Sequence, residues 1–311
     1  MRRRREATLL RWLYHSALRG FARYSFPVWQ SLGIHLTPVH YYQPVPDTRT
    51  LTDSIWEQRS ELVGLDLNEQ TQLTLLDEFS RVWRMEYEGF PKDREEAHPH
   101  QYYVNNRAFT AVDGEVLYCM IRKFRPRKII EIGSGFSTLL AAQAILRNQE
   151  ESGQECELVA CDPHPMELLA AGFPGLTKLF PKRVEELPVS FFAGLRENDI
   201  LFVDSSHVLR IAGDVQYEFL EIIPRVAKGV LVHVHDIFLP AEYLKEWVMR
   251  QREFYSEQYL LQAFLAFNKA FRVLWAASYM HLQHPDKLEA AFSSYQRTLR
   301  WPGSFWFRRV E

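Results

Sequence analysis

Short apolar runs alternate with longer amphipathic segments through the C-terminal part of the chain. Short apolar runs predict strands at residues 129–132, 158–161, 200–203 and 230–234. Apolar residues at three- and four-residue spacing predict helices at residues 113–124, 137–146 and 211–223. Because strands that alternate with helices usually form a parallel sheet with right-handed crossovers, the pattern indicates an α/β fold.

Further elements are expected on both sides of this region. The pattern predicts helices at residues 68–87 and 255–267, and strands at residues 271–276 and 304–307. We expect the last two strands to form a hairpin that closes the sheet. The charged loop at residues 92–100 marks a boundary between an N-terminal helical and Pro-rich extension (1–100) and a sheet-containing domain (101–311).

The first part of the extension is basic and amphipathic. Residues 2–23 contain seven arginines and one acid, interleaved with leucine and aromatic residues. Such a helix either packs its apolar face on the protein body, which we favour, or lies on an anionic membrane surface. Residues 33–47 follow, with three prolines and the adjacent Tyr41 and Tyr42. Because proline disrupts helices and central strands, we expect an ordered loop that covers a site.

Composition and charge narrow the functional classes. The chain has 311 residues, 47% of them hydrophobic, and a net charge of −2, so nothing in the balance calls for nucleic acid. The three cysteines have no metal-binding spacing, which favours a reducing compartment. Apolar runs are too short for a membrane span, and the N-terminus lacks the apolar stretch of a signal peptide. We expect an unprocessed cytoplasmic protein.

A glycine turn joins the first predicted strand of the alternating region to the helix after it. The string Glu131-Ile-Gly-Ser-Gly-Phe-Ser-Thr138 has the strand, turn and helix start at which α/β proteins bind nucleotides. Gly133 and Gly135 allow the backbone to approach a ligand, and Ser137 and Thr138 are candidate helix caps. Thr138 stands where a dinucleotide fingerprint has its third glycine.

Asp162 ends the next strand. An acid at this position accepts hydrogen bonds from both ribose hydroxyls in nucleoside-binding α/β folds. The plainer interpretation is a helix cap before Pro163. Together with the glycine turn, we favour the ribose role.

Two Asp/His clusters follow the next two predicted strands. They are Asp204-Ser-Ser-His207 and His233-Val-His-Asp236. Because the carboxyl ends of parallel strands meet at one edge, we expect these side chains to converge in a ligand crevice. They could bind a divalent cation through Asp204, Asp236 and one histidine, or provide His207 or His235 as a general base. His233 and His235 share a strand face, which leaves a structural role open for one of them.

The assembled motifs resemble the class I S-adenosylmethionine (SAM)-dependent methyltransferases, in particular a bacterial branch. The strings that carry the resemblance are the Pro-rich His-Tyr-Tyr segment, the glycine turn, Asp-Ser-Ser-His, His-Asp-Ile-Phe and Glu-Gln-Tyr. The resemblance implies a Rossmann-like, mostly parallel seven-stranded sheet with helices on both faces and the last strand antiparallel. It also implies a set of residues that contact SAM: Glu131, Gly133, Ser134, Gly135, Ser137, Asp162 and Asp204.

A more distant similarity is to the metal-dependent catechol-type O-methyltransferases. Asp204 matches their first metal-binding acid, His207 falls on the position of their lysine base, and His235-Asp236 replaces an Asp-Asn pair. The similarity implies a metal site at Asp204, His235 and Asp236. The substitutions leave a metal-free histidine base and a divalent cation equally open.

We therefore expect methyl transfer from SAM to a hydroxyl of a small molecule such as a sugar or a phenol. Residues expected near the acceptor are Tyr41, Tyr42, Tyr103, Asn106 and Glu257. N-methylation of an amine or imidazole, and a non-catalytic SAM-binding interaction protein, are the alternatives. Homo-oligomerisation stays open.

Overall fold

The computed structural model describes residues 2–311, with side chains described from Ser16 onward. The chain forms two compact units, Met1–Ile55 and Trp56–Glu311, and each is described by itself. None of the described helices combines the length and the apolarity needed to cross a bilayer.

The first unit consists of one long helix and an irregular segment. Helix α1 spans Arg2–Ser31, so the helix predicted over residues 2–23 is confirmed and continues further. The Pro-rich segment after it has no regular structure up to a 3-10 turn at Thr48–Thr50, as its prolines predict. Within this unit the ring of His35 stacks on Phe26 of α1, with 5.1 Å between ring centroids.

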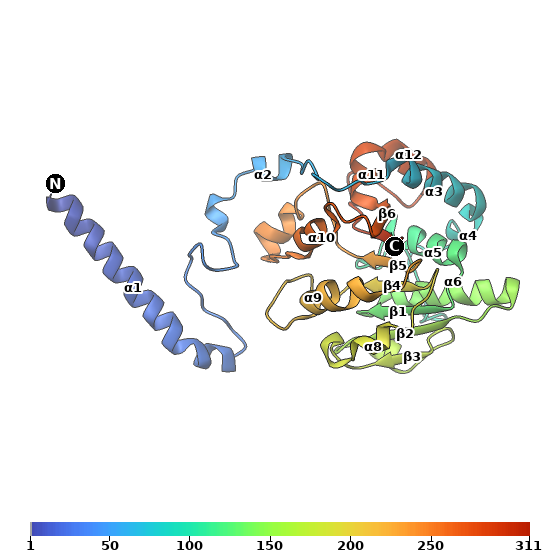
Figure 1. Cartoon of the computed structure of the whole chain (residues 1–311), viewed down its shortest axis with the longest axis horizontal. Helices are drawn as coiled ribbons and strands as arrows, with labels where there is room; N and C mark the ends of the chain where they lie inside the picture. The colour runs from blue at the N-terminus through green and yellow to red at the C-terminus, as the bar shows by residue number, and fades with distance from the viewer. Residues whose placement is uncertain (1) are drawn as a thin grey trace. The chain divides into compact units, whose positions relative to one another are not determined.

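The second unit is built on a seven-stranded sheet (Figure 1). Its strands are β1 (Lys128–Ile132), β2 (Glu157–Cys161), β3 (Lys178–Phe180), β4 (Ile200–Val203), β5 (Leu231–Val234), β6 (Phe271–Ala276) and β7 (Phe305–Arg309). Their order is β3-β2-β1-β4-β5-β7-β6. Strands β1 to β5 pair in parallel, and β7 is antiparallel to both β5 and β6. The predicted α/β fold with an antiparallel last strand is confirmed, and β6, not β7, forms the edge.

Two elements differ from the sequence pattern. Strand β3 was not predicted, because three partly exposed residues at a sheet edge are too few to show a period. The helix predicted at residues 211–223 is broken into α9 (Asp214–Tyr217), a π-helical turn at Glu218–Ile222 and a 3-10 turn at Ile223–Arg225.

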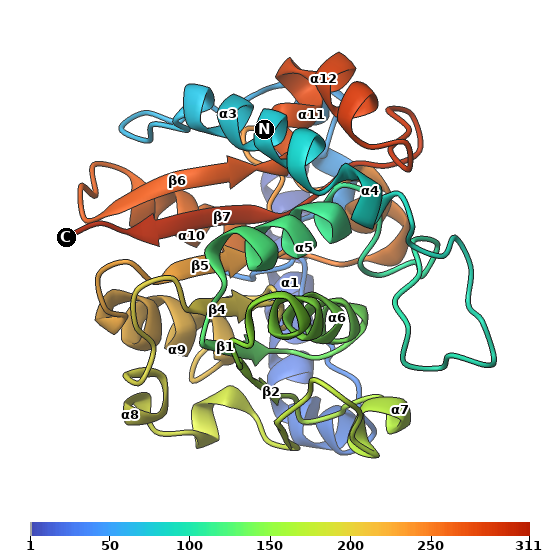
Figure 2. The same cartoon turned by 90° about the vertical axis from the view of Figure 1, so that its right-hand side faces the viewer.

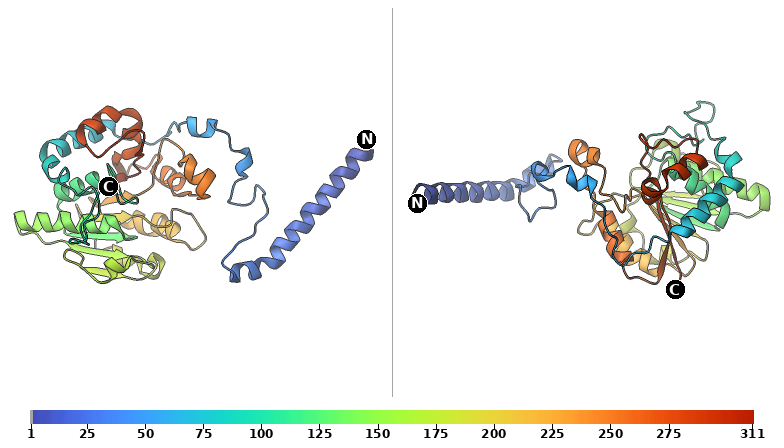
Figure 3. Two further views of the ribbon diagram at one scale, coloured as in Figure 1. Left: turned by 180° about the vertical axis from the view of Figure 1, so that it is seen from behind. Right: turned by 90° about the horizontal axis from the view of Figure 1, so that it is seen from above.

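Helices cover both faces of the sheet (Figures 2 and 3). The remaining helices are α2 (Ser54–Glu57), α3 (Glu69–Val82), α4 (Arg84–Tyr87), α5 (Asp113–Phe124), α6 (Phe136–Ser152), α7 (Glu167–Ala170), α8 (Val189–Phe192), α10 (Glu257–Leu265), α11 (Ala277–Gln283) and α12 (Pro285–Ala291). Because strand side chains alternate, Ile129 packs into the core under α3, α5 and α6, while Ile130 packs into the core under α9 and α10. Burying each such side chain contributes about 1.5–3 kcal/mol.

The structural division of the chain lies at residue 55, whereas the charged loop suggested residue 100. Helix α3 buries Leu76 and Phe79 in the same core as α5 and α6. Its Gln72 side chain also accepts a hydrogen bond from Ala276 N of the sheet at 2.9 Å. Residues 56–100 therefore belong to the sheet-containing unit, because the apolar face of α3 has its partner there.

A buried carboxylate fixes the start of α5. Glu115 accepts hydrogen bonds from Val112 N, at 2.7 Å, and from the Ser294 hydroxyl. Burial raises the pKa of Glu115 to about 7, although these hydrogen bonds oppose the shift. The folded protein therefore holds a proton that the unfolded chain releases at lower pH.

We predict that Glu115→Gln changes how stability depends on pH. The pKa of Glu115 is higher in the folded state than its ordinary value of 4.5, so its contribution is fully present below pH 4.5 and is lost as pH rises past about 7. The free energy of unfolding of the wild type, relative to the variant, should fall by up to about 3 kcal/mol between pH 5 and pH 8. Urea titrations of both proteins measure this difference, and a constant difference would contradict the assignment.

Candidate functional site

A cavity of 710 Å³ lies at the carboxyl ends of the parallel strands. It is bordered by the glycine turn between β1 and α6 and by the segments that follow β2, β3 and β4. This is the edge at which α/β sheets bind ligands, as the motif positions predict.

Gly133 brings two strand ends into contact. Its φ is +87°, and a Cβ atom built on it would lie 2.0 Å from the carbonyl oxygen of Asp204. Asp204 N in turn donates to Ile132 O at 2.9 Å. A side chain at position 133 would therefore force β1 and β4 apart. Gly135 differs, because a Cβ there would meet no described atom within 4 Å.

Asp162 holds the glycine turn from the end of β2. One carboxylate oxygen accepts from Ser134 N at 3.0 Å and from the Ser134 hydroxyl at 2.7 Å. The other accepts from His164 N at 2.7 Å, a local turn rather than the helix cap of the plainer interpretation, because the next helix begins at Glu167. Asp162 also lines the cavity, so capping the next turn and facing a ligand are compatible.

Glu131 lies beneath the turn. Its carboxylate accepts from the Ser137 hydroxyl at 2.6 Å, and its second oxygen has no hydrogen-bond partner among the described groups. Burial raises the pKa of Glu131 to about 8, against the opposing effect of Ser137. Helix capping falls to Thr138, whose hydroxyl accepts from Gly135 N at 2.9 Å. Of the two candidate caps, Thr138 caps α6, whereas the Ser137 hydroxyl donates a hydrogen bond to Glu131.

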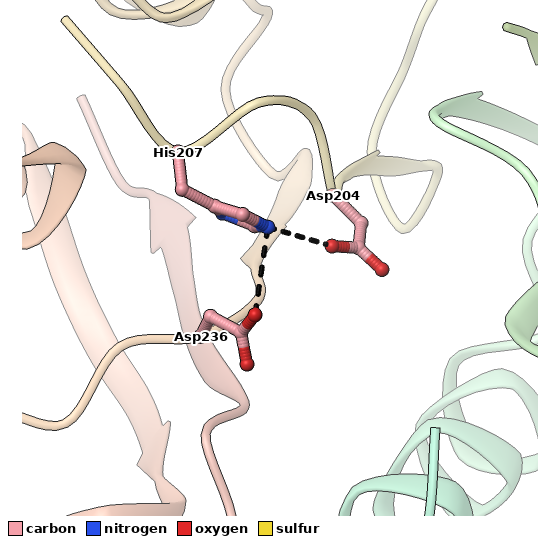
Figure 4. Close-up of side chains that lie close together, drawn as sticks. All are labelled: Asp204, His207 and Asp236. Carbon is pink, nitrogen blue, oxygen red and sulfur yellow. Dashed lines mark ion pairs between the residues drawn. The ribbon is translucent and has the colours of Figure 1, made fainter. Parts of the chain in front are cut away.

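The two Asp/His clusters converge as predicted. His207 Nε2 lies 3.3 Å from an oxygen of Asp204 and 3.5 Å from an oxygen of Asp236 (Figure 4). On the other side of the ring, Nδ1 lies 2.8 Å from Glu257, a buried residue at the start of α10. One ligand atom from each of Asp204, His207 and Asp236 lies within 4.8 Å of the others, a spacing that suits a metal ion.

His235 also lies close to the carboxylates of Asp204 and Asp236. Its Nδ1 is 3.6 Å from Asp204 and 3.5 Å from Asp236. Its Nε2 is 3.6 Å from Asp113, whose carboxylate also accepts two backbone N–H groups ahead of β7. In the group with metal-binding spacing, the imidazole is that of His207, whereas the family similarity implied His235.

Carboxylates outnumber imidazoles in this cluster. Burial disfavours a charged His207, but the carboxylates of Asp204 and Glu257 outweigh burial and hold the His207 pKa well above its ordinary value. Burial likewise disfavours ionised Asp204, but His235 and His207 hold the Asp204 pKa well below its ordinary range. Burial raises the pKa of Asp236 and of Glu257. The arrangement therefore attracts positive charge, either protons on both imidazoles or a bound cation.

His233 has a different role from His235. Its ring stacks on Phe202, with 3.9 Å between centroids, and packs on Trp306. Neither ring nitrogen has a hydrogen-bond partner among the described residues, and burial lowers the pKa of His233 well below its ordinary value. His233 is thus a neutral core residue, the structural role that the shared strand face left open.

Three of the five residues expected near the acceptor, Tyr103, Asn106 and Glu257, belong to the second unit. Tyr103 packs edge-on against Phe136 of the glycine turn, which lines the cavity. The Asn106 amide makes four hydrogen bonds within its own loop, and Glu257 is fully buried behind His207, so both are poor candidates for direct contact with an acceptor. Tyr41 and Tyr42 are 81% and 79% exposed in the first unit, and their role stays a prediction.

Sequence reasoning missed part of the cavity wall. Arg183 and Glu185 line it from the segment after β3, and Arg210 and Asp214 line it from the segment after β4. The first pair could have been found only with β3 assigned, because its position depends on that short strand. Asp214 accepts from Ser206 N and from the Ser206 hydroxyl, which shapes the loop that carries His207.

Comparisons with known proteins concern this same region. Residues 130–237 match the model of a family described as a methyltransferase domain. An uncharacterized protein of Archaeoglobus fulgidus is 30% identical over 178 residues, which are 55% of this chain and 78% of that protein. The family match contains the glycine turn, Asp162 and both Asp/His clusters.

Two solved structures are also similar to this chain. A methyltransferase of Podospora anserina, bound to S-adenosylhomocysteine (SAH), has 15% identity and a TM-score of 0.40, and the match covers 78% of this chain and 94% of that one. An O-methyltransferase of Bacillus cereus in complex with SAH has 11% identity and a TM-score of 0.34, with coverage of 76% and 91%.

We predict that alanine destabilises the fold at one glycine of the turn and has almost no effect at the other. Gly133→Ala should destabilise the fold by about 2–4 kcal/mol, because the new Cβ collides with the Asp204 backbone at a positive φ. Gly135→Ala is the matched control and should leave the thermal midpoint nearly unchanged. Equal destabilisation of the two variants in thermal unfolding would contradict this account of the turn.

Proposed function

The chain belongs to the class I SAM-dependent methyltransferases, and on this premise we propose that it methylates a hydroxyl oxygen of a small molecule, a sugar or a phenol. The observation that carries the proposal is the Asp204, His207 and Asp236 cluster next to the cavity. Two carboxylates and an imidazole suit a divalent cation. A hydroxyl acceptor benefits from a cation because it must lose a proton to become a strong nucleophile, whereas a neutral amine already is one.

Two features of the cavity support it as the SAM site. The space beside Gly135 is open, and the Asp162 carboxylate lines the wall. When bound, SAM supplies a methyl group on a positively charged sulfur, which is a good leaving group without further activation. Asp162 would accept hydrogen bonds from ribose hydroxyls, and Gly135 would allow close backbone approach.

The residues of the cluster would prepare the acceptor. A cation held by Asp204, His207 and Asp236 would lower the pKa of an acceptor hydroxyl. Glu257 accepts a hydrogen bond from His207 Nδ1–H. This bond fixes the ring and leaves Nε2 directed at the two aspartates. Asp204 also lines the cavity, so one side chain borders both the cavity and the cluster. The enzyme's contribution is then alignment and charge rather than leaving-group activation.

A metal-free histidine base is the competing route. A base must be unprotonated at the working pH to accept a proton from the acceptor. The carboxylates around His207 and His235 hold the pKa of each imidazole well above its ordinary value, so both would already carry the proton. A cation that displaces the proton from His207 Nε2 would use the same carboxylates as its ligands.

We predict that Asp162→Ala weakens SAM binding by roughly ten- to a hundredfold, the effect of losing hydrogen bonds to a charged group. Isothermal titration calorimetry with SAM measures the change. Asp66→Ala is the matched control and should leave the affinity unchanged, since Asp66 also accepts from a backbone N–H two residues on, Asn68 N at 2.8 Å, but does not line the cavity. Unchanged affinity in Asp162→Ala, with an unaltered thermal midpoint, would overturn the assignment of this cavity to SAM.

We also predict that chelation abolishes methyl transfer and that Mg²⁺ or Mn²⁺ restores it. Transfer of labelled methyl groups to a panel of phenols and sugars measures the activity. Asp236→Asn should weaken Mn²⁺ binding to the chelated protein by roughly ten- to a hundredfold, whereas His98→Gln, at an exposed histidine outside the site, should not. Full turnover after exhaustive chelation, combined with its loss in His207→Gln, would instead make the imidazole the base.

A further inference from the structure

Helix α1 has two chemically distinct sides. An α-helix repeats every 3.6 residues, so positions 17, 21, 24 and 28 share one face. The sequence places alanine, phenylalanine, tyrosine and valine at these positions. Positions 19 and 23, both arginine, fall on the other side. In the described part of the helix, from Ser16 onward, Phe21, Tyr24 and Val28 thus lie opposite Arg19 and Arg23.

The apolar face is exposed where its side chains are described. Phe21 is 59% exposed, Tyr24 85% and Val28 60%. Continuous exposure of large apolar side chains usually marks a surface that binds a partner. Within the first unit nothing described covers these side chains, so this face is available to a partner.

The positive charge of helix α1 indicates what kind of partner fits it. Residues 2–23 hold seven arginines and one acid, and no Asp or Glu occurs from Ala7 to Pro46. A second copy of the helix would bring arginine against arginine with no acid to pair. An anionic lipid surface matches both sides of the helix, since it offers phosphate groups to the arginines and acyl chains to the apolar face.

Within the first unit, the Pro-rich segment packs against only one side of α1. Phe26 stacks on His35, and Arg19 and Arg23 line a hollow of 370 Å³ together with His40 and Tyr42 of that segment. The segment thus packs on the arginine side of α1 and leaves Phe21, Tyr24 and Val28 uncovered within this unit. Both arginines remain exposed.

We propose that helix α1 binds in the plane of an anionic lipid membrane, with Phe21, Tyr24 and Val28 inserted and the arginines at the headgroup phosphates. Each arginine near such a surface contributes about 1 kcal/mol, and each inserted side chain adds apolar burial. This inference does not depend on the proposed function, because it uses no residue of the cavity.

Cosedimentation of the full chain with vesicles tests the proposal. The wild type should sediment with equimolar phosphatidylglycerol and phosphatidylcholine, but not with phosphatidylcholine alone, and high salt should weaken the binding. Replacing Phe21, Tyr24 and Val28 with serine, or Arg11, Arg19 and Arg23 with glutamine, should reduce binding at least about tenfold. The matched control replaces the exposed Arg94, Arg250 and Arg252 with glutamine and should bind like the wild type.

Each other outcome overturns the proposal. Binding that survives both triple substitutions would assign membrane contact to another surface. The absence of binding would exclude a lipid partner, and sedimentation velocity would then show whether the apolar face forms a dimer that the serine variant abolishes. A loss of thermal stability in the serine variant without vesicles would show that this face packs within the protein.

Discussion

The site depends on the contact between Gly133 and the backbone of Asp204. Because no side chain fits at position 133, the turn after β1 lies directly against the end of β4. That contact joins the two halves of the site. The glycine turn borders the cavity, and the side chain of Asp204 reaches from the same cavity to the histidines of the neighbouring cluster. Cofactor and acceptor chemistry are thus linked through one short stretch of backbone.

Charge is the second constraint. Four carboxylates, those of Asp113, Asp204, Asp236 and Glu257, surround two imidazoles in a mostly buried space. Buried charges persist only when they are paired or bind ions. The neutral core residue His233 shows the contrast, since its environment of Phe202 and Trp306 provides no charge and lowers its pKa. Two histidines on the same strand face therefore differ in function because their neighbours differ.

Much of the fold was predictable from local pattern. The runs at β1, β2, β4 and β5 are apolar and mostly buried, and α5 and α6 carry regular apolar spacing. Strand β3 was missed because a three-residue edge strand shows no period, and with it the cavity residues Arg183 and Glu185 were missed. The helix predicted at residues 211–223 is broken by the π-helical turn at Glu218–Ile222, which the spacing of apolar residues does not indicate.

By itself, the sequence determined which chemical groups reach the carboxyl edge of the sheet. Strand ends and glycines are set locally, so the local pattern is enough to assign Gly133, Asp162, Asp204 and the two Asp/His strings to that edge. Only the tertiary structure decided their roles. It places Glu257 behind His207, and the Asn106 amide forms hydrogen bonds to the backbone of its own loop. Those outcomes depend on contacts and loop conformations that the spacing of apolar and polar residues does not specify.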